Sequence, residues 1–177
     1  LLRYRRSALG PWWLTISMGA MIAGMGPLYA TLFGTELSKF FPHLTLGIIF
    51  WTLFTSISQD SSATFINSAN YIKQGDFPVI LFVWRTLSRC FIQFAHHIVL
   101  YIPVAFYVKI DISLSSFLFI PAFLLFFLNA HFVSISLGIV CARFRDVAQI
   151  VTSLMQLLMF LTPVFWMPSS LPDRAKY

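Results

Sequence analysis

The chain has 177 residues, of which 58% are hydrophobic, 18% aromatic and 10% charged, with a mean hydropathy of +0.80. Soluble domains are about 45–50% apolar and about 25% charged, so this composition excludes a soluble enzyme, a nucleic-acid-binding domain and a disordered tail. The net charge of +6 therefore indicates Lys and Arg gathered at one face of a membrane, with no nucleic-acid partner.

Five runs without charged residues are long enough, or nearly so, for membrane-spanning helices, which need about 20 apolar residues each. We predict an all-α fold, a polytopic integral membrane helical bundle that forms a single transmembrane domain over residues 1–177. The spans are predicted near residues 12–34, 45–66, 87–108, 116–140 and 149–167, with cytoplasmic loops at 67–86 and 141–148. Because the connections are short, neighbouring spans should run antiparallel.

The distribution of Lys and Arg predicts the orientation of the chain. A cytoplasmic N-terminus places eight of these residues inside and four outside, as the positive-inside rule prefers. The inside group is Arg3, Arg5, Arg6, Lys73, Arg85, Arg89, Arg143 and Arg145. The outside group is Lys39, Lys109, Arg174 and Lys176.

In the second predicted span, Asp60 lies among hydroxyl side chains. An ionisable residue inside a span is costly and is a functional hypothesis by default. Water and the neighbouring hydroxyls at the cytoplasmic end can also solvate it, and the sequence leaves both interpretations open.

Histidines supply an alternative from another class, an intramembrane metal or haem enzyme that uses His96 or His97 with His131. Adjacent helical residues point about 100° apart, so His96 and His97 cannot share a face. No carboxylate accompanies them in either span, and the two cysteines, Cys90 and Cys141, have no metal or redox spacing. We therefore predict no metal site and favour interhelical hydrogen bonds for the histidines. No catalytic motif or phosphate-binding P-loop is visible either.

Several short stretches, taken in order along the chain, resemble one family, the membrane subunit of type-2 ABC exporters in the polysaccharide and polyol-phosphate export group. A basic arm runs into Leu9-Gly10-Pro11-Trp12-Trp13, and the predicted loops contain Asn67–Lys73 with Phe77-Pro78, and Arg143–Val147. The last span carries Gln156-Leu157, Met159–Val164 and Leu171-Pro172. Gln74 stands where the family usually has a second basic residue.

The resemblance implies a permease that is not itself an enzyme and that moves lipid-linked O-antigen, capsule or teichoic-acid chains across the bacterial inner membrane. Two copies would pair with each other and with two ATP-binding subunits, which would hold ATP and Mg, while this chain has no cofactor of its own. Six spans are expected in a full member, so the chain looks truncated at both ends.

The resemblance also implies two sets of site residues. The loops would dock the ATP-binding subunits through Asn70, Tyr71, Lys73, Phe77, Pro78, Arg143, Arg145 and Asp146. Sugar rings stack on flat aromatic faces, so the candidate glycan channel comprises Trp13, Trp51, Phe54, Tyr101, Phe165 and Trp166. Lipid-belt and core packing is the competing interpretation for these aromatic residues. A drug or small-lipid exporter of the same superfamily and a non-catalytic membrane assembly factor stay open as alternatives.

Overall fold

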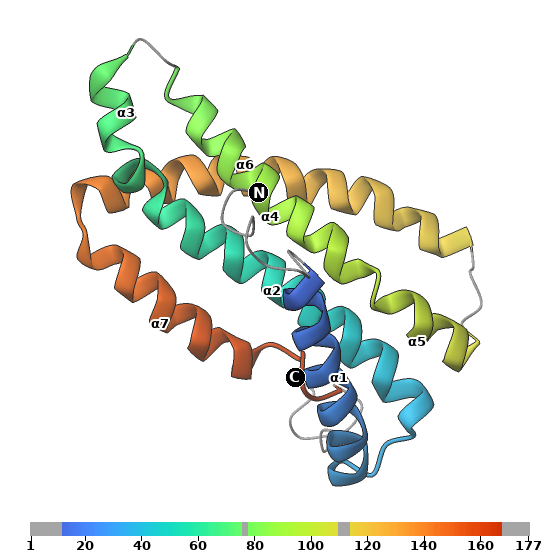
Figure 1. Cartoon of the computed structure of the whole chain (residues 1–177). Helices are drawn as coiled ribbons and strands as arrows, with labels where there is room; N and C mark the ends of the chain where they lie inside the picture. The colour runs from blue at the N-terminus through green and yellow to red at the C-terminus, as the bar shows by residue number, and fades with distance from the viewer. Residues whose placement is uncertain (1–11, 76–77, 110–113, 168–177) are drawn as a thin grey trace. The chain divides into compact units, whose positions relative to one another are not determined.

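The computed structural model describes residues 12–75, 78–109 and 114–167, and these residues are helical with no strand among them. The prediction of an all-α helical bundle is therefore confirmed. The elements in chain order are α1 (Trp12–Leu32), α2 (Leu37–Asn67), α3 (Ala69–Gln74), α4 (Ile80–Ile98), α5 (Tyr101–Val108), the 3-10 helix η2 (Leu114–Leu118), α6 (Phe119–Arg143) and α7 (Asp146–Leu161) (Figure 1).

Within the described ranges, three helical stretches are long and apolar enough to cross a membrane by length and composition. They are Leu37–Gln74, Ile80–Val108 and Ser116–Arg143, and α7 is a shorter apolar helix. A helix also lies in the first predicted range, where α1 continues through Pro27. The count of five spans and the single domain stay predictions.

Three helices begin earlier than the predicted spans, and of these α7 does so by only three residues, at Asp146 instead of residue 149. The second span was placed from residue 45, but α2 begins at Leu37, close to the exposed ion pair between Lys39 and Glu36. Water can solvate charged residues at a helix end, so the helix extends beyond the apolar run. The third span was placed from residue 87, but α4 begins at Ile80 and buries Val83, Leu87 and Cys90 on one side. This spacing is that of an amphipathic helix, whose other face tolerates Arg.

The predicted third span is divided into two helices. A break between α4 and α5 at Val99 and Leu100 precedes Pro103. Proline has no N–H to donate to the carbonyl four residues earlier, and its ring clashes with that carbonyl. The backbone instead forms tighter bonds at the break, from Leu100 N–H to His97 O (3.0 Å) and from Ile102 N–H to Val99 O (3.2 Å).

The chain forms two compact units. The first contains the described parts of Leu1–Thr52, Gln93–Ile110 and Met159–Tyr177. Its core joins α1 to the first half of α2 through Ile22, Ala30, Phe40, Leu44, Ile48 and Val164. The segment after α7 packs here as well, because the ring nitrogen Nε2 of His43 lies 3.0 Å from the carbonyl oxygen of Pro163.

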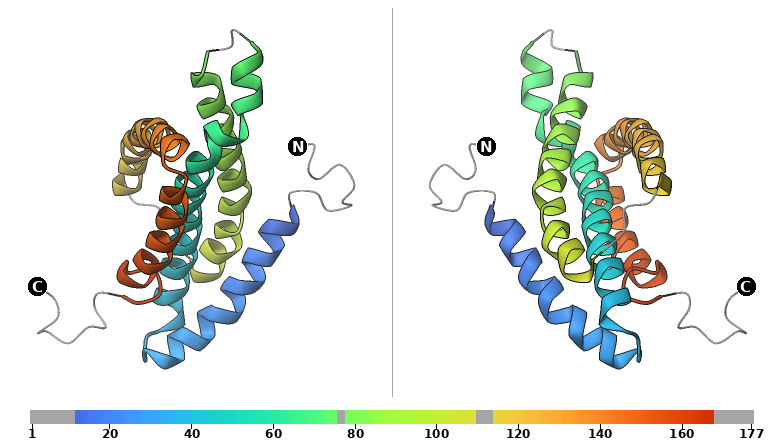
Figure 2. Two further views of the ribbon diagram at one scale, coloured as in Figure 1. Left: turned by 90° about the vertical axis from the view of Figure 1, so that its left-hand side faces the viewer. Right: turned by 90° about the vertical axis from the view of Figure 1, so that its right-hand side faces the viewer.

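The second unit contains Leu53–Ile92 and the described part of Asp111–Leu158. It joins the second half of α2 to α4 and to α6, and both views in Figure 2 show α2 and α4 side by side. Hydroxyl pairs connect these helices: Ser61 donates to Ser134 (2.8 Å), and the hydroxyl oxygens of Thr64 and Thr86 are 2.9 Å apart. Buried polar groups in membrane helices are stabilised by such interhelical hydrogen bonds.

Candidate functional site

The two predicted loops lie at the same end of the second unit. Helices α2 and α6 run in the same direction, because Ser61 pairs with Ser134 and, one turn later, Phe65 contacts Gly138. Continuing this register brings the end of α2 level with the end of α6 at Arg143. Helix α4 runs the opposite way, since Asp60 pairs with Arg89 and Thr64 with Thr86, so α4 begins at that same end.

The structure gathers the described docking candidates at this end, and all of them are exposed. Asn70, Tyr71 and Lys73 lie on α3, Pro78 lies two residues before α4 begins, and Arg143, Arg145 and Asp146 lie at the junction of α6 and α7. Phe77 lies outside the described residues. Among the described residues, Lys73, Arg143 and Arg145 have no carboxylate within ion-pair distance. A basic, exposed surface results.

The turn from α6 to α7 is short and well defined. Phe144 adopts an extended backbone (φ −124°, ψ 96°), and its N–H donates to Val140 O at 2.8 Å, which closes the last turn of α6. Asp146 then begins α7, where a negative charge favours the positive end of the helix dipole. The exposed Phe144 ring lies 6.0 Å from the guanidinium of Arg143. Apolar and basic groups are thus presented together.

Asp60 forms an ion pair with Arg89 on α4, with 2.7 Å between Oδ2 and Nη2. The thiol of Cys90 also donates to Oδ2 at 3.5 Å. The side chain of Asp60 is 39% exposed and that of Arg89 is 60% exposed. The carboxylate is therefore neither isolated nor deeply buried. The sequence interpretations both overlooked this partner, although Arg89 ends an uncharged run just as Asp60 does.

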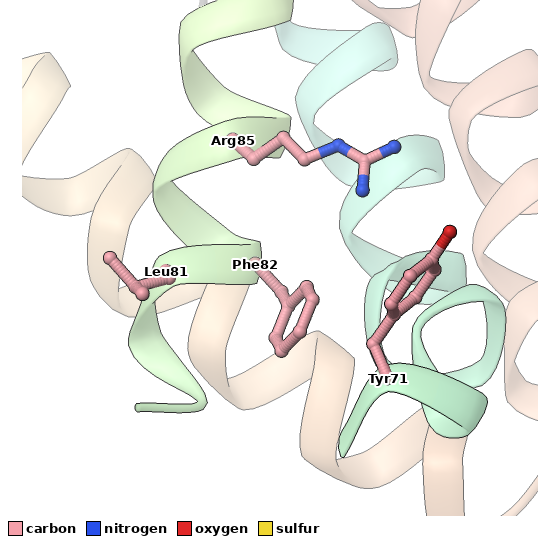
Figure 3. A pocket seen from close by; sticks show the side chains of 4 residues that line it. All are labelled: Tyr71, Leu81, Phe82 and Arg85. Atoms are coloured by element: carbon pink, nitrogen blue, oxygen red, sulfur yellow. The ribbon is translucent and has the colours of Figure 1, made fainter. Parts of the chain in front are cut away.

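A pocket of about 220 Å³ lies between α3 and the beginning of α4. Tyr71, Leu81, Phe82 and Arg85 line it (Figure 3). Of these residues only Tyr71 was a predicted site residue, and Arg85 entered the prediction only as a charge on the cytoplasmic side. Phe82 and Arg85 are three residues apart on α4 and so lie on the same face of the helix, a spacing that could have predicted both as neighbours in the site.

The channel candidates do not form one cluster. Trp13 on α1 is 58% exposed, whereas Trp51 and Phe165 pack against the core of the first unit. The ring of Phe165 stacks with Tyr29 at 5.9 Å between centroids. Trp166 Nε1 donates to Phe160 O at 3.4 Å, and Tyr101 is half-buried at the start of α5. Phe54 belongs to the second unit. Their place in a channel stays a prediction.

A polar stripe on α7 was missed by the sequence analysis. Gln149, Ser153 and Gln156 are all exposed and follow the i, i+4, i+7 spacing of one helix face. No described residue forms a hydrogen bond with their side chains. Their spacing along the sequence could have predicted this polar face, since the three residues recur at helical intervals in an otherwise apolar helix.

Two of the histidines contact aromatic rings on neighbouring helices, and the predicted interhelical hydrogen bonds stay a prediction. Trp12 meets His96 edge-on at 5.4 Å between ring centroids, and Trp84 lies 5.1 Å from His131. Within the described part of the chain, His97 Nε2 and His131 Nδ1 are buried without a hydrogen-bond partner. No group of three His, Cys, Asp or Glu side chains able to hold a metal occurs among the described residues.

The sequence matches the family described as ABC-2 type transporter over residues 1–176. No curated protein matches the chain. The match covers every helix given above, including both groups of docking candidates.

Proposed function

The chain belongs to the ABC-2 type transporter family, and from this premise we propose that it exports lipid-linked polysaccharide across the bacterial inner membrane. Membership makes the chain a multi-pass permease subunit of an ABC transporter and not an enzyme, with ATP hydrolysis in a separate ATP-binding subunit. The metal or haem enzyme is thereby set aside as an alternative. The glycan substrate, the pairing of two copies and the bacterial inner membrane are parts of our proposal.

The polar stripe on α7 supports a neutral, hydroxyl-rich substrate. After Asp146, residues 147–161 of α7 contain no charged side chain. Amide and hydroxyl groups donate and accept hydrogen bonds, as sugar hydroxyls do, so Gln149, Ser153 and Gln156 are complementary to a glycan. A cationic drug would need carboxylates to replace its hydration, and residues 147–161 of α7 offer none. A glycan therefore fits the exposed face of α7 better than a cationic drug does.

We propose that the exposed basic end of the second unit docks the ATP-binding subunits. α3 presents Asn70 and Lys73, and the α6–α7 junction presents Arg143, Phe144 and Arg145. Such mixtures of Arg and exposed aromatic side chains are enriched at protein interfaces. Both segments continue directly into long helices, so movement of a docked subunit would be passed to the spans.

Export by variants of the complete transporter tests the proposal. Gln149→Leu with Gln156→Leu removes hydrogen-bonding groups from an exposed face, so the protein should keep its level and its ATP-binding subunit while lipid-linked glycan accumulates in the cytoplasm. Ile150→Leu with Leu154→Ile is the matched control on the neighbouring face of α7 and should export at the parental rate. Phe165→Asp and Trp166→Ala test the aromatic candidates in the same assay.

The outcomes distinguish a defect in substrate transport from a defect in assembly with the ATP-binding subunit. Arg143→Glu with Arg145→Glu should reduce co-purification of the ATP-binding subunit without changing the helix content of the permease. Export at the parental rate by the two-glutamine variant would remove the evidence for a glycan pathway on α7. Efflux of drugs with unchanged glycan distribution would show that the protein is a drug exporter instead.

A further inference from the structure

The pocket between α3 and α4 is lined almost wholly by apolar atoms, so the polar ends of Arg85 and Tyr71 lie at its edge. Figure 3 shows the Arg85 guanidinium and the Tyr71 hydroxyl on the same side, with the Phe82 ring between α4 and Tyr71. No described residue pairs with the charge of Arg85 or hydrogen-bonds the Tyr71 hydroxyl. A guanidinium and a phenol can together donate several hydrogen bonds to phosphate oxygens.

The charge pattern places this pocket at the boundary of the membrane. Residues 90–108, between Arg89 and Lys109, are uncharged and would span about 28 Å as helix, close to the hydrocarbon thickness. Arg85 lies one turn before Arg89, about 6 Å beyond the hydrocarbon, where lipid headgroups form a layer of similar depth. Exposed Trp84 is adjacent on α4, and tryptophan prefers this same level.

The size and surroundings of the pocket exclude two other occupants. At about 220 Å³ it is smaller than the roughly 300–1,000 Å³ of ordinary small-molecule sites. A soluble ATP-binding subunit would have to enter the headgroup layer to reach Arg85, whereas Lys73 lies on the short helix α3 after the end of α2 and Arg145 lies between α6 and α7. Leu81, 50% exposed, adds apolar surface beside the pocket.

We propose that an anionic membrane phospholipid binds here, with Arg85 and Tyr71 as donors to its phosphate at the edge of the pocket and the apolar lining, including the ring of Phe82, against the apolar part of the lipid. Headgroup sites of this kind occur where basic side chains meet helices at a membrane surface. The bound lipid would fix α3 against α4, next to the segment proposed to dock the ATP-binding subunit. The assignment does not depend on which substrate is exported.

Native mass spectrometry of the complete purified permease with phosphatidylglycerol tests this assignment. Arg85→Gln should weaken retention of the lipid about tenfold, the loss expected for a hydrogen bond to a charged group, and Tyr71→Phe should weaken it less. Arg145→Gln is the matched control, because it removes the same charge from the same unit and should leave retention unchanged. Circular dichroism confirms that the variants fold.

Four other outcomes would contradict the lipid site. Unchanged retention in Arg85→Gln would show that the pocket is not the lipid site, and equal losses in Arg85→Gln and Arg145→Gln would show diffuse attraction to charge. Displacement of the lipid by excess inorganic phosphate would identify a free-anion site. Loss of the ATP-binding subunit from Arg85→Gln with phosphatidylglycerol retained would assign the pocket to that partner protein.

Discussion

The packing of α1 on α2 depends on a close contact between Gly26 of α1 and the ring of Phe41 of α2. A Cβ atom added at Gly26 would overlap the ring of Phe41, whereas one added at Gly24, half a turn away, would meet no atom within 4 Å. Overpacking a buried contact costs about 1–3 kcal/mol, while replacing an unconstrained helical glycine by alanine gains about 0.5–1 kcal/mol. The two glycines therefore have opposite roles despite their shared chemistry.

We expect Gly26→Ala to lower the midpoint of thermal unfolding in detergent and Gly24→Ala to leave it unchanged or raise it slightly. The second substitution is the control for helix propensity, because both sites lie within α1. If Phe41→Leu is combined with Gly26→Ala, part of the loss should return, since the smaller side chain makes room. Equal midpoints for the two single variants would contradict the packing described here.

The ion pair between Asp60 and Arg89 gives a second prediction at this scale. Asp60→Asn should destabilise the protein by about 1 kcal/mol, and exchanging the charges, Asp60→Arg with Arg89→Asp, should recover part of that loss. Glu36→Gln is the matched control, because the pair between Glu36 and Lys39 is more exposed, at 67% and 73%, and should contribute little. Unfolding in detergent measures all three, and an exchange variant weaker than Asp60→Asn would show that the pair has no favourable coupling.

At the scale of elements, uncharged runs predicted where helices lie because burial in lipid excludes charge. The helices α2 and α4 begin before these runs, since a helix continues into water as long as its exposed face can be solvated, as Lys39 and Arg85 show. A proline alone does not predict a break, since α1 continues through Pro27 whereas a break after α4 precedes Pro103.

Which side chains form hydrogen bonds between helices could not be predicted from the sequence. Ser61, Thr64, Thr86 and Ser134 are common residues in apolar helices, and only the fold matches each with its partner. The docking candidates came from the resemblance of the two loops to the family, and they stay predictions. The pocket and the α7 stripe were missed, because each depends on which face of a helix is exposed. Periodicity along α7 would have revealed the stripe.

At the scale of the whole molecule, the distribution of cations defines an orientation. The register of α2, α4 and α6 places Lys73, Arg85, Arg143 and Arg145 toward one end of the second unit. Described carboxylates on this unit are Asp60, already paired with Arg89, and Asp146. An excess of Lys and Arg in short connections marks the cytoplasmic face, so we expect this end of the unit to face the cytoplasm.

Single-cysteine labelling in intact cells tests that orientation. The background carries Cys90→Ser, which keeps a donor for Asp60, and Cys141→Ala, because both thiols are buried. Gly75→Cys, at an exposed site after α3, should react with a membrane-impermeant maleimide only after the cells are opened. Ser38→Cys, at an exposed site near the start of α2, should react in intact cells, because one predicted span separates the two positions. If Gly75→Cys reacts in intact cells while Ser38→Cys is protected, the basic end faces outward, and the ATP-binding subunit cannot dock there.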